Sequence, residues 1–242
     1  MNDERIINAI KALSIAQISK AGSGHPGIAL GAAPILYTLY SKHLNIDVLD
    51  EKWINRDRFV LSAGHASALL YSMLYMSGFD ISINDLKEFR QINSITPGHP
   101  EYGVTKGVDM STGPLGQGIA SAVGMAISAK YLKEKFNGLI SYNTYVLCSE
   151  GDLMEGVSYE ACSLAGNLKL DNLIVILDSN KVTLDGSLKD SFDEDILKRF
   201  EAMGWYTQVV ADGNNPLLID MAINKAKRCK GQPSFIEVKT VI

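Results

Sequence analysis

The chain has 242 residues, of which 46% are hydrophobic and 21% charged, and its formal net charge is −4. This composition supports a large buried core and excludes the strongly basic class of nucleic-acid-binding and membrane-surface proteins. The N-terminus does not resemble a signal peptide, the longest run of small apolar residues (119–129) is too short to span a bilayer, and the scattered cysteines fit buried, reduced thiols. We therefore expect a cytoplasmic protein that binds neither nucleic acid nor membrane.

Helical patterns dominate the first half of the chain. Apolar residues at helical spacing predict an amphipathic helix over 3–20, with Asn2 or Asp3 as its cap. A second, buried helix is expected over 28–44, where Pro34 either kinks the helix or shifts its start. The other elements expected here are a short strand at 59–61, helices at 66–76 and 83–89, and a long helix opened by 111–118 that continues through 135.

Strands and helices alternate in the second half. The expected strands are 144–148, 173–177, 205–210 and 234–241, and the expected helices are 156–168, 193–203 and 216–229. This alternation predicts an α/β fold with a parallel β-sheet flanked by helices. The sequence shows no linker, so we expect residues 1–242 to form a single domain. The chain stops on its last strand, as if more chain or another subunit should follow.

Two clusters of oxygen-bearing side chains each come directly after an expected buried strand. Glu150 and Asp152 follow one strand, and Asp178 and Asn180 follow the next. The helix between them makes this a βαβ unit, so both strands end at the edge of the sheet where open α/β sheets bind ligands. Hard cations such as Mg²⁺ bind such oxygens and complete their shell with phosphate and water. The stretch therefore predicts a metal-bridged phosphate site.

Three of the four histidines, His25, His65 and His99, each follow a glycine in an irregular segment. A single loop histidine is usually structural, but three in the same setting favour a function. Cysteine pairs are absent from their neighbourhood, so the spacing does not resemble a structural zinc site. Imidazoles that exchange protons near pH 7 suit a hydroxylated or phosphorylated substrate.

The glycine-rich segment 112–118 and two glutamates carry weaker signals. The segment matches neither a Walker loop nor a dinucleotide fingerprint, so by itself it indicates only a tight entry into a helix. Glu155 and Glu160 lie five residues apart on an expected helix and share a broad face at best. Taken alone, they are equally well explained as solvated carboxylates.

The assembled motifs resemble the transketolase family, and they follow the family's order over nearly the whole chain. The matching stretches are SGHPG at 23–27, DRFVLSAGHASALLYSML at 57–74, TPGHPE at 96–101, STGPLGQGIASAVGMA at 111–126 and GDLMEGVSYEACSLAGNLKLDNLIVILDSNKVTLDG at 151–186. The resemblance is to the family's N-terminal third, the domain of the thiamine diphosphate-binding fold that holds the diphosphate end of the cofactor. It implies thiamine diphosphate and Mg²⁺ (or Ca²⁺ or Mn²⁺) as cofactors.

Carried over residue by residue, the resemblance implies a role for each candidate. The metal ligands would be Glu150, Asn180 and the backbone carbonyl of Val182. The residues that match cofactor-binding positions are His65, Gly113, Pro114, Leu115, Gly151 and Asn180. His25 and His99 match catalytic histidines that contact the substrate. Glu155 and Glu160 match interface carboxylates that link paired active sites, and the resemblance also implies a catalytic role for Glu155.

One departure from the family pattern affects the proposed metal ligand. The family usually has Gly-Asp-Gly or Ser-Asp-Gly, whereas this chain has Ser-Glu-Gly at 149–151. Glu150 lies 30 residues before Asn180, which is within the usual motif spacing, and Asp152 lies 28 before it and aligns less well. We assign the ligand to Glu150, with Asp152 as the fallback. The longer glutamate side chain puts the metal preference or affinity in question, because Mg²⁺ demands near-ideal geometry.

The resemblance implies that the chain works as part of a transketolase, which moves a two-carbon ketol unit from a ketose phosphate to an aldose phosphate. A pyrimidine-binding C-terminal domain or subunit would complete it, in a homodimer or heterotetramer. The family's remaining active-site residues have no counterpart here: a histidine-bearing loop, the glutamate that activates the aminopyrimidine, and the basic residues that grip the sugar phosphate. Alone, the chain should be inactive.

Two other interpretations stay open. One is another thiamine diphosphate enzyme, such as a deoxyxylulose-phosphate synthase or a split transketolase for an unusual sugar, although SGHPG and TPGHPE favour transketolase itself. The other is a non-catalytic domain that keeps the fold, which the glutamate at position 150 and the missing residues would suit.

Overall fold

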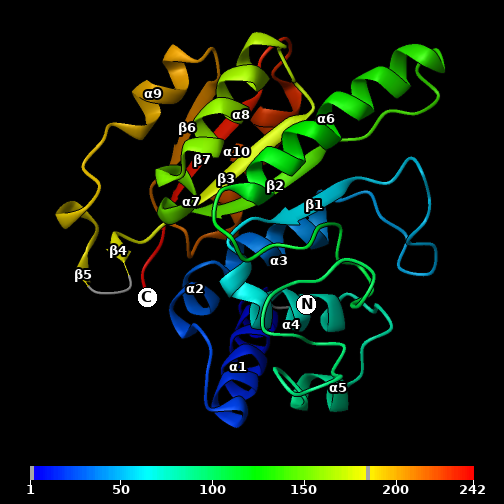
Figure 1. The fold of residues 1–242 in the computed structure, drawn as a ribbon, viewed down its shortest axis with the longest axis vertical. Helices are drawn as coiled ribbons and strands as arrows, with labels where there is room; N and C mark the ends of the chain where they lie inside the picture. Colours follow the sequence, from blue (N-terminus) through cyan, green and yellow to red (C-terminus); the bar gives the residue numbers. More distant parts are fainter. Residues whose placement is uncertain (1–2, 184–185) are drawn as a thin grey trace.

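The computed structural model of this chain describes residues 3–183 and 186–242, so Asn2, one of the two expected helix caps, lies outside the described residues. Five parallel strands form the central sheet in the order β1-β2-β3-β7-β6 (Figure 1). Their bounds are β1 Arg58–Leu61, β2 Thr144–Ser149, β3 Leu173–Ser179, β6 Tyr206–Val210 and β7 Ser234–Lys239. The predicted α/β class with a parallel sheet is confirmed.

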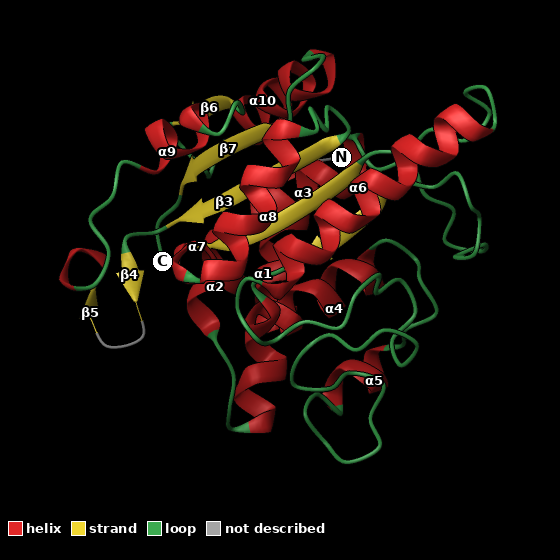
Figure 2. Ribbon diagram, turned by 45° about the horizontal axis from the view of Figure 1, so that its top comes forward, coloured by secondary structure: helices red, strands yellow, loops and turns green. Residues whose placement is uncertain are grey.

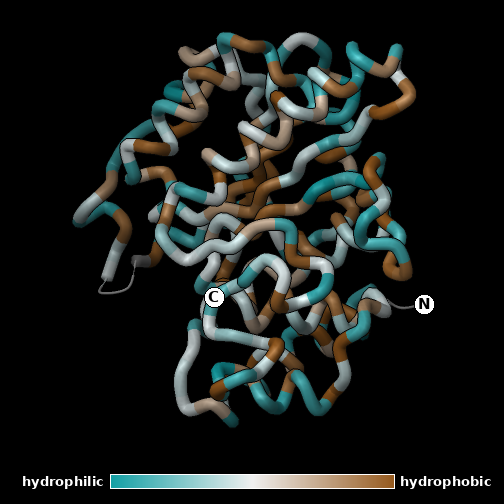
Figure 3. The backbone as a smooth tube through the Cα atoms, turned by 45° about the vertical axis from the view of Figure 1, so that its right-hand side comes forward, coloured by the Kyte–Doolittle hydropathy of each residue, from teal (hydrophilic) through white to brown (hydrophobic). Residues whose placement is uncertain are grey.

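Both faces of the sheet are buried, which is why its inner strands are continuous apolar runs. Along β2, Tyr145 and Leu147 belong to one hydrophobic cluster, and Val146 and Cys148 belong to the other. Successive side chains of a strand point to opposite faces, so each inner strand contributes to two cores. Figure 3 shows the apolar residues concentrated along these central strands.

Helices cover the two faces unequally. The first core contains side chains of α1 Asp3–Ala21, α2 Pro26–Gly31, α3 Ala33–Lys42, α4 Ser67–Met76 and α10 Pro216–Arg228. The second contains side chains of α6 Gln117–Lys135, α8 Gly156–Asn167 and α9 Ile196–Ala202. Figure 2 shows α6 and α8 lying across the sheet, while α1, α4 and α5 Ile83–Lys87 extend beyond it.

Several elements differ from the prediction. The single helix expected over 28–44 is divided at Ala32 into α2 and α3, with Pro34 in the first turn of α3, where proline is tolerated. The helix expected from 193 begins only at Ile196, because Asp195 caps it by accepting from the Lys198 N–H at 3.1 Å. The sequence reading missed the short helix α7 Glu150–Met154, the two-residue strands β4 Val182–Thr183 and β5 Gly186–Ser187, and the 3-10 turns at Gly64–Ala66 and Leu188–Asp190.

Among the described residues, none of the helices combines the length and the apolar character needed to cross a membrane.

Candidate cofactor and metal site

The carboxyl ends of four neighbouring strands bring most of the candidate residues to one edge of the sheet. Because all pairings in the central sheet are parallel, β1, β2, β3 and β7 end together. Ser149 lies opposite Asp178, and Ser179 lies opposite Lys239. Figure 1 shows α7, β4 and the C-terminus at this edge. The expected convergence of the two acidic clusters is therefore present in the fold.

The three candidate metal donors come from two segments that meet at this edge. Lys181 has a φ of +62°, a left-handed conformation that turns the backbone sharply between Asn180 and Val182. The turn brings the Lys181 N–H to 3.5 Å from Oε1 of Glu150, and Oδ1 of Asn180 accepts from the Val182 N–H at 2.9 Å. The carboxylate of Glu150 and the amide oxygen of Asn180 thus lie at one bend, which leads directly into Val182.

Two carboxyl groups at this edge are buried without a compensating cation. Glu150 is 3% exposed, and burial, with a further contribution from the charge of Asp178, raises the pKa of Glu150 to about 7. Asp178 is fully buried, and burial raises its pKa to about 6. In the part of the chain that the structure describes, neither forms an ion pair. An uncompensated buried carboxylate is costly, so the pair favours a bound cation.

The donor set fits a hard cation that also binds phosphate. Within 3–183 and 186–242, no three His, Cys, Asp or Glu side chains gather as a metal centre. A metal held here would therefore depend on amide, backbone and ligand oxygens in addition to Glu150, which is how Mg²⁺ is bound in many phosphate-handling sites.

Asp152, the fallback ligand, is occupied by a different task. Its Oδ1 accepts from the Ser62 hydroxyl at 2.6 Å and from the Gly116 N–H at 2.9 Å. Its Oδ2 accepts from the N–H and the hydroxyl of Ser149 at 2.9 and 3.1 Å. With four donors on two oxygens, this buried carboxylate ties the loops after β1 and β2 to the start of α6, which leaves Glu150 as the better candidate ligand.

The glycine-rich segment is packed where a side chain would not fit. A Cβ on Gly64 would lie 2.7 Å from the backbone nitrogen of Gly113, and Gly113 itself has a φ of +149° and lies against His99. Leu115 lies against Gly151, since a Cβ there would be 3.1 Å from a Leu115 methyl group. The segment therefore connects the histidine loops to the acidic cluster, and it ends at the N-terminus of α6, which favours anions.

The three candidate histidines form one cluster. The rings of His25 and His65 meet edge to face at 5.1 Å between centroids. Burial lowers the pKa of His65 to about 4, with further contributions from His25 and His99. Burial also lowers the pKa of His25 and of His99, and Arg90 adds to both effects. The imidazoles are therefore neutral at pH 7 and able to accept as well as donate, and Nδ1 of His25 is buried without a hydrogen-bond partner in the described structure.

Arg90 was missed by the sequence reading. It has a φ of +64°, its Nη1 donates to the Ser23 hydroxyl at 3.3 Å, and its Nε lies next to Gly98. It also lines an open pocket of about 340 Å³ together with His99. A single arginine after a short helix forms no recognisable sequence pattern. Its place in the site is evident only from the fold, which brings it close to Ser23 and Gly98.

Glu155 and Glu160 are both exposed and lie at the cap and in the second turn of α8. Glu155 is close to the start of α6, because a Cβ on Gly116 would lie 2.8 Å from the Cβ of Glu155. Apolar side chains of the same helix and of its C-cap residue are also open to solvent: Val157 39%, Leu164 45% and Leu168 43% exposed. The structure thus places both glutamates beside an apolar surface that the described chain leaves uncovered.

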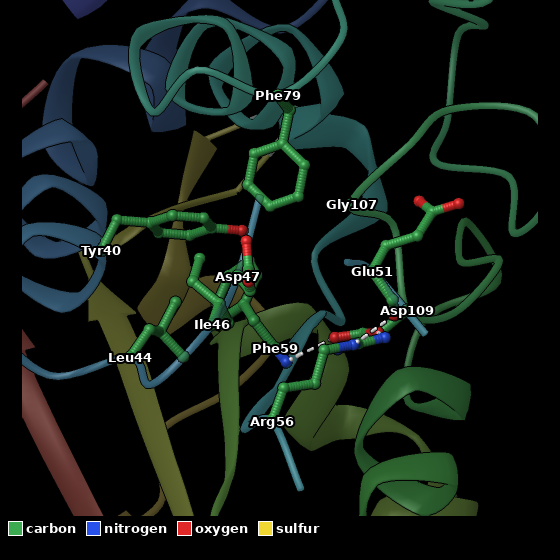
Figure 4. A pocket seen from close by; sticks show the side chains of 10 residues that line it. All are labelled: Tyr40, Leu44, Ile46, Asp47, Glu51, Arg56, Phe59, Phe79, Gly107 and Asp109. Carbon is green, nitrogen blue, oxygen red and sulfur yellow. Dashed lines mark hydrogen bonds and ion pairs between the residues drawn. The ribbon is translucent and has the colours of Figure 1, made fainter. Parts of the chain in front are cut away.

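A cavity elsewhere in the molecule does not belong to this edge. Figure 4 shows it beside the start of β1, lined by Tyr40 and Phe79 among others, with Arg56 paired to Asp109. Its volume of about 20 Å³ has room for a water molecule but not for a substrate. It therefore belongs to the packing of the amino-terminal edge.

Comparison with known proteins agrees with the geometry. Residues 2–242 match the family described as "Transketolase, thiamine diphosphate binding domain". The chain is 56% identical to a transketolase of Bacillus subtilis (strain 168), covering 99% of this chain and 37% of the relative, and 53% identical to one of Aquifex aeolicus (strain VF5), covering 99% and 35%.

Solved structures give the same result. A transketolase from Leishmania mexicana superposes with a TM-score of 0.98 at 44% identity over 99% of this chain and 37% of that one. The transketolase from Campylobacter jejuni subsp. jejuni NCTC 11168 gives 0.94 at 47% identity over 99% and 38%. The chain spans little more than a third of the length of these relatives. It belongs to the transketolase family and corresponds to the thiamine diphosphate-binding domain.

Proposed function

We propose that this member of the transketolase family is the diphosphate-binding part of a transketolase, acting as one domain over residues 1–242. The reaction would transfer a two-carbon ketol unit from a ketose phosphate to an aldose phosphate. The observation that supports the proposal is that Glu150, Asn180 and the histidine cluster meet at one edge of the sheet. The family that the chain matches is described as a thiamine diphosphate binding domain.

In this proposal Glu150, Asn180 and the Val182 carbonyl hold Mg²⁺, or Ca²⁺ or Mn²⁺, against the cofactor diphosphate. The uncompensated carboxyl of Glu150 supports the assignment, since a cation would offset the free-energy cost of burying it. Gly151 and the N-terminus of α6 would face the diphosphate, and His65 would donate to it. When bound, thiamine diphosphate supplies a nucleophilic carbon and an electron sink.

The remaining residues would act on the cofactor ring and the substrate. Gly113, Pro114 and Leu115 would lie beside the thiamine, since this segment runs from the histidine cluster to Gly151. His25 and His99, neutral at pH 7, would donate hydrogen bonds to the substrate oxygens and accept from its hydroxyl groups.

The proposal includes a partner. We infer that a pyrimidine-binding domain or subunit completes the active site and that Glu155 and Glu160 lie in the interface of a homodimer or heterotetramer. The exposed apolar side chains of α8 support this, because they suit the core of a protein interface. The chain alone would be inactive. Its three free cysteines suit a reducing compartment, and we propose a cytoplasmic location.

The test is a coupled transketolase assay on the chain with and without the candidate partner, combined with calorimetric titration of thiamine diphosphate and Mg²⁺. We expect turnover and metal-dependent binding only in the complex. Binding without turnover of any ketose phosphate would favour the non-catalytic interpretation, and no binding to the complex at all would exclude the enzyme.

A further inference from the structure

We propose that Asp178, held by Thr240, is a positioning residue that fixes which way the side-chain amide of Asn180 points. This inference rests on the proposed role of Asn180 as a metal ligand and adds two residues to it. It connects the candidate metal site to Thr240, which directly follows β7.

Asp178 contacts both residues directly. It lies at the end of β3, fully buried, and its Oδ2 accepts from Nδ2 of Asn180 at 3.2 Å. Its Oδ1 accepts from the Thr240 hydroxyl at 2.5 Å. Each carboxylate oxygen therefore has one protein donor, and the two donors come from different strand ends.

This contact determines the orientation of the amide. An ionised carboxylate only accepts, whereas an amide has a donor side and an acceptor side, so the NH₂ group of Asn180 has to face Asp178. Oδ1 is then directed the other way, where it accepts from the Val182 N–H at 2.9 Å and keeps a second lone pair. Only the oxygen of an amide binds a hard cation, so a flipped amide would present the wrong atom.

Thr240 is itself held firmly enough to act as an anchor. Its N–H donates to the Ser179 carbonyl at 3.1 Å, and the residue is 8% exposed. Two glycines leave room for it: a Cβ on Gly31 would lie 3.3 Å from Oγ1 of Thr240, and a Cβ on Gly213 would lie 2.8 Å from its methyl group. The hydroxyl therefore has a fixed position beneath the carboxylate.

Four variants test whether Asp178 and Thr240 position Asn180: Asp178→Ala, Asp178→Asn, Thr240→Val and Thr240→Ser. The probe is Mn²⁺ in the presence of thiamine diphosphate, titrated into the complex of the chain with its partner and followed by electron paramagnetic resonance. Thermal unfolding of each variant is measured in parallel, since a purely structural role would change stability without changing metal affinity.

Loss of the acceptor in Asp178→Ala is expected to weaken Mn²⁺ binding by about 10- to 100-fold, the usual effect of removing an outer-shell partner. Asp178→Asn should keep most of the affinity, because its amide oxygen can still accept from Asn180 while the Thr240 hydroxyl turns to accept. Thr240→Val, with the same shape and no hydroxyl, should weaken binding by roughly 5-fold, and Thr240→Ser, which keeps the hydroxyl, should bind like the wild type.

Two results would overturn the proposal while leaving the proposed function intact. One is equal loss in Asp178→Asn and Asp178→Ala, which would make Asp178 a direct ligand or a charge donor. The other is unchanged affinity in Thr240→Val. If Asp178→Ala does not fold, the comparison of Thr240→Val with Thr240→Ser tests the proposal. Failure of the wild-type complex to bind Mn²⁺ would instead contradict the proposed function and this inference together.

Discussion

Buried acids at the two ends of the sheet are treated differently. At the amino end, Asp109 is paired with Arg56 and also accepts from the Phe59 N–H at 2.9 Å, while Asp57 accepts from the N–H groups of Asn45 and Asn143. At the carboxyl end, Glu150 and Asp178 are as deeply buried but have no basic partner in the described chain. Asp109 is thus offset by a guanidinium, whereas no basic side chain of the described chain offsets the charge of Glu150, the candidate metal ligand.

The largest expected effect is on cofactor binding at the carboxyl end. Glu150→Ala should weaken Mg²⁺-dependent binding of thiamine diphosphate to the complex by more than the roughly 100-fold that loss of an outer-shell group costs, because it removes a direct ligand. Calorimetric titration measures the change. Asp152→Ala is the matched comparison. Because Asp152 holds Ser62, Gly116 and Ser149, its main effect should be a loss of folding stability. If Asp152→Ala abolishes binding and Glu150→Ala does not, the ligand is Asp152.

At the amino end the same kind of substitution should affect stability instead. Asp109→Asn leaves the guanidinium of Arg56 buried without its charge partner and should lower the free energy of unfolding by about 3 kcal/mol. Urea denaturation measures this loss. Metal-dependent cofactor binding by the folded variant should stay at the wild-type level, and a loss of affinity without a loss of stability would erase the distinction between the two ends.

The pH dependence of stability should test the burial of Glu150. Since the pKa of Glu150 is raised to about 7 in the folded state, its contribution is fully present below its ordinary value of 4.5 and is lost as the pH rises through 7. Glu150→Gln cannot lose this proton. Relative to the wild type without metal, it should gain roughly 2 kcal/mol between about pH 5 and pH 8.

Chemical denaturation at a series of pH values measures this gain. A flat difference between Glu150→Gln and the wild type would mean that the carboxyl group is not desolvated as the structure indicates.

The smallest expected effect concerns His65, a partly buried base at the carboxyl end. Its pKa is lowered from 6.5 to about 4, so its contribution to stability is fully present above 6.5 and is lost as the pH falls toward 4. His65→Gln should reduce the loss of stability between about pH 7 and pH 5.5 by about 1 kcal/mol. Denaturation at the two pH values tests this, and an unchanged slope would place His65 in solvent.

The elements that the sequence located best are those with strong periodicity. The helix continuing to Lys135 and the apolar strands before Glu150 and Asp178 lie where they were expected. The helix over 28–44 was predicted as one element in which Pro34 causes a kink or a later start, and the structure breaks it at Ala32, two residues before that proline. The sequence could not show that Gly27 and Gly31 lie against Ile242 from the far end of the chain. Such a contact leaves no local pattern.

The candidate site divides in the same way. The oxygen donors at strand ends could be identified from residue types and from the common direction of parallel strands. The sequence could not assign a task to Asp152, to Arg90 or to Thr240, because each acts through a partner that is distant in the chain: Ser62, Ser23 and Asp178 respectively.

The sequence by itself determined the α/β class, the βαβ unit around the acidic clusters and the match to the transketolase family, since these depend on periodicity and on short motifs. Only the tertiary structure decided which acids are satisfied and which are not. Desolvation and hydrogen-bond partners are properties of the packed chain, so Glu150 and Asp152, two residues apart, differ in role for reasons that no local pattern contains.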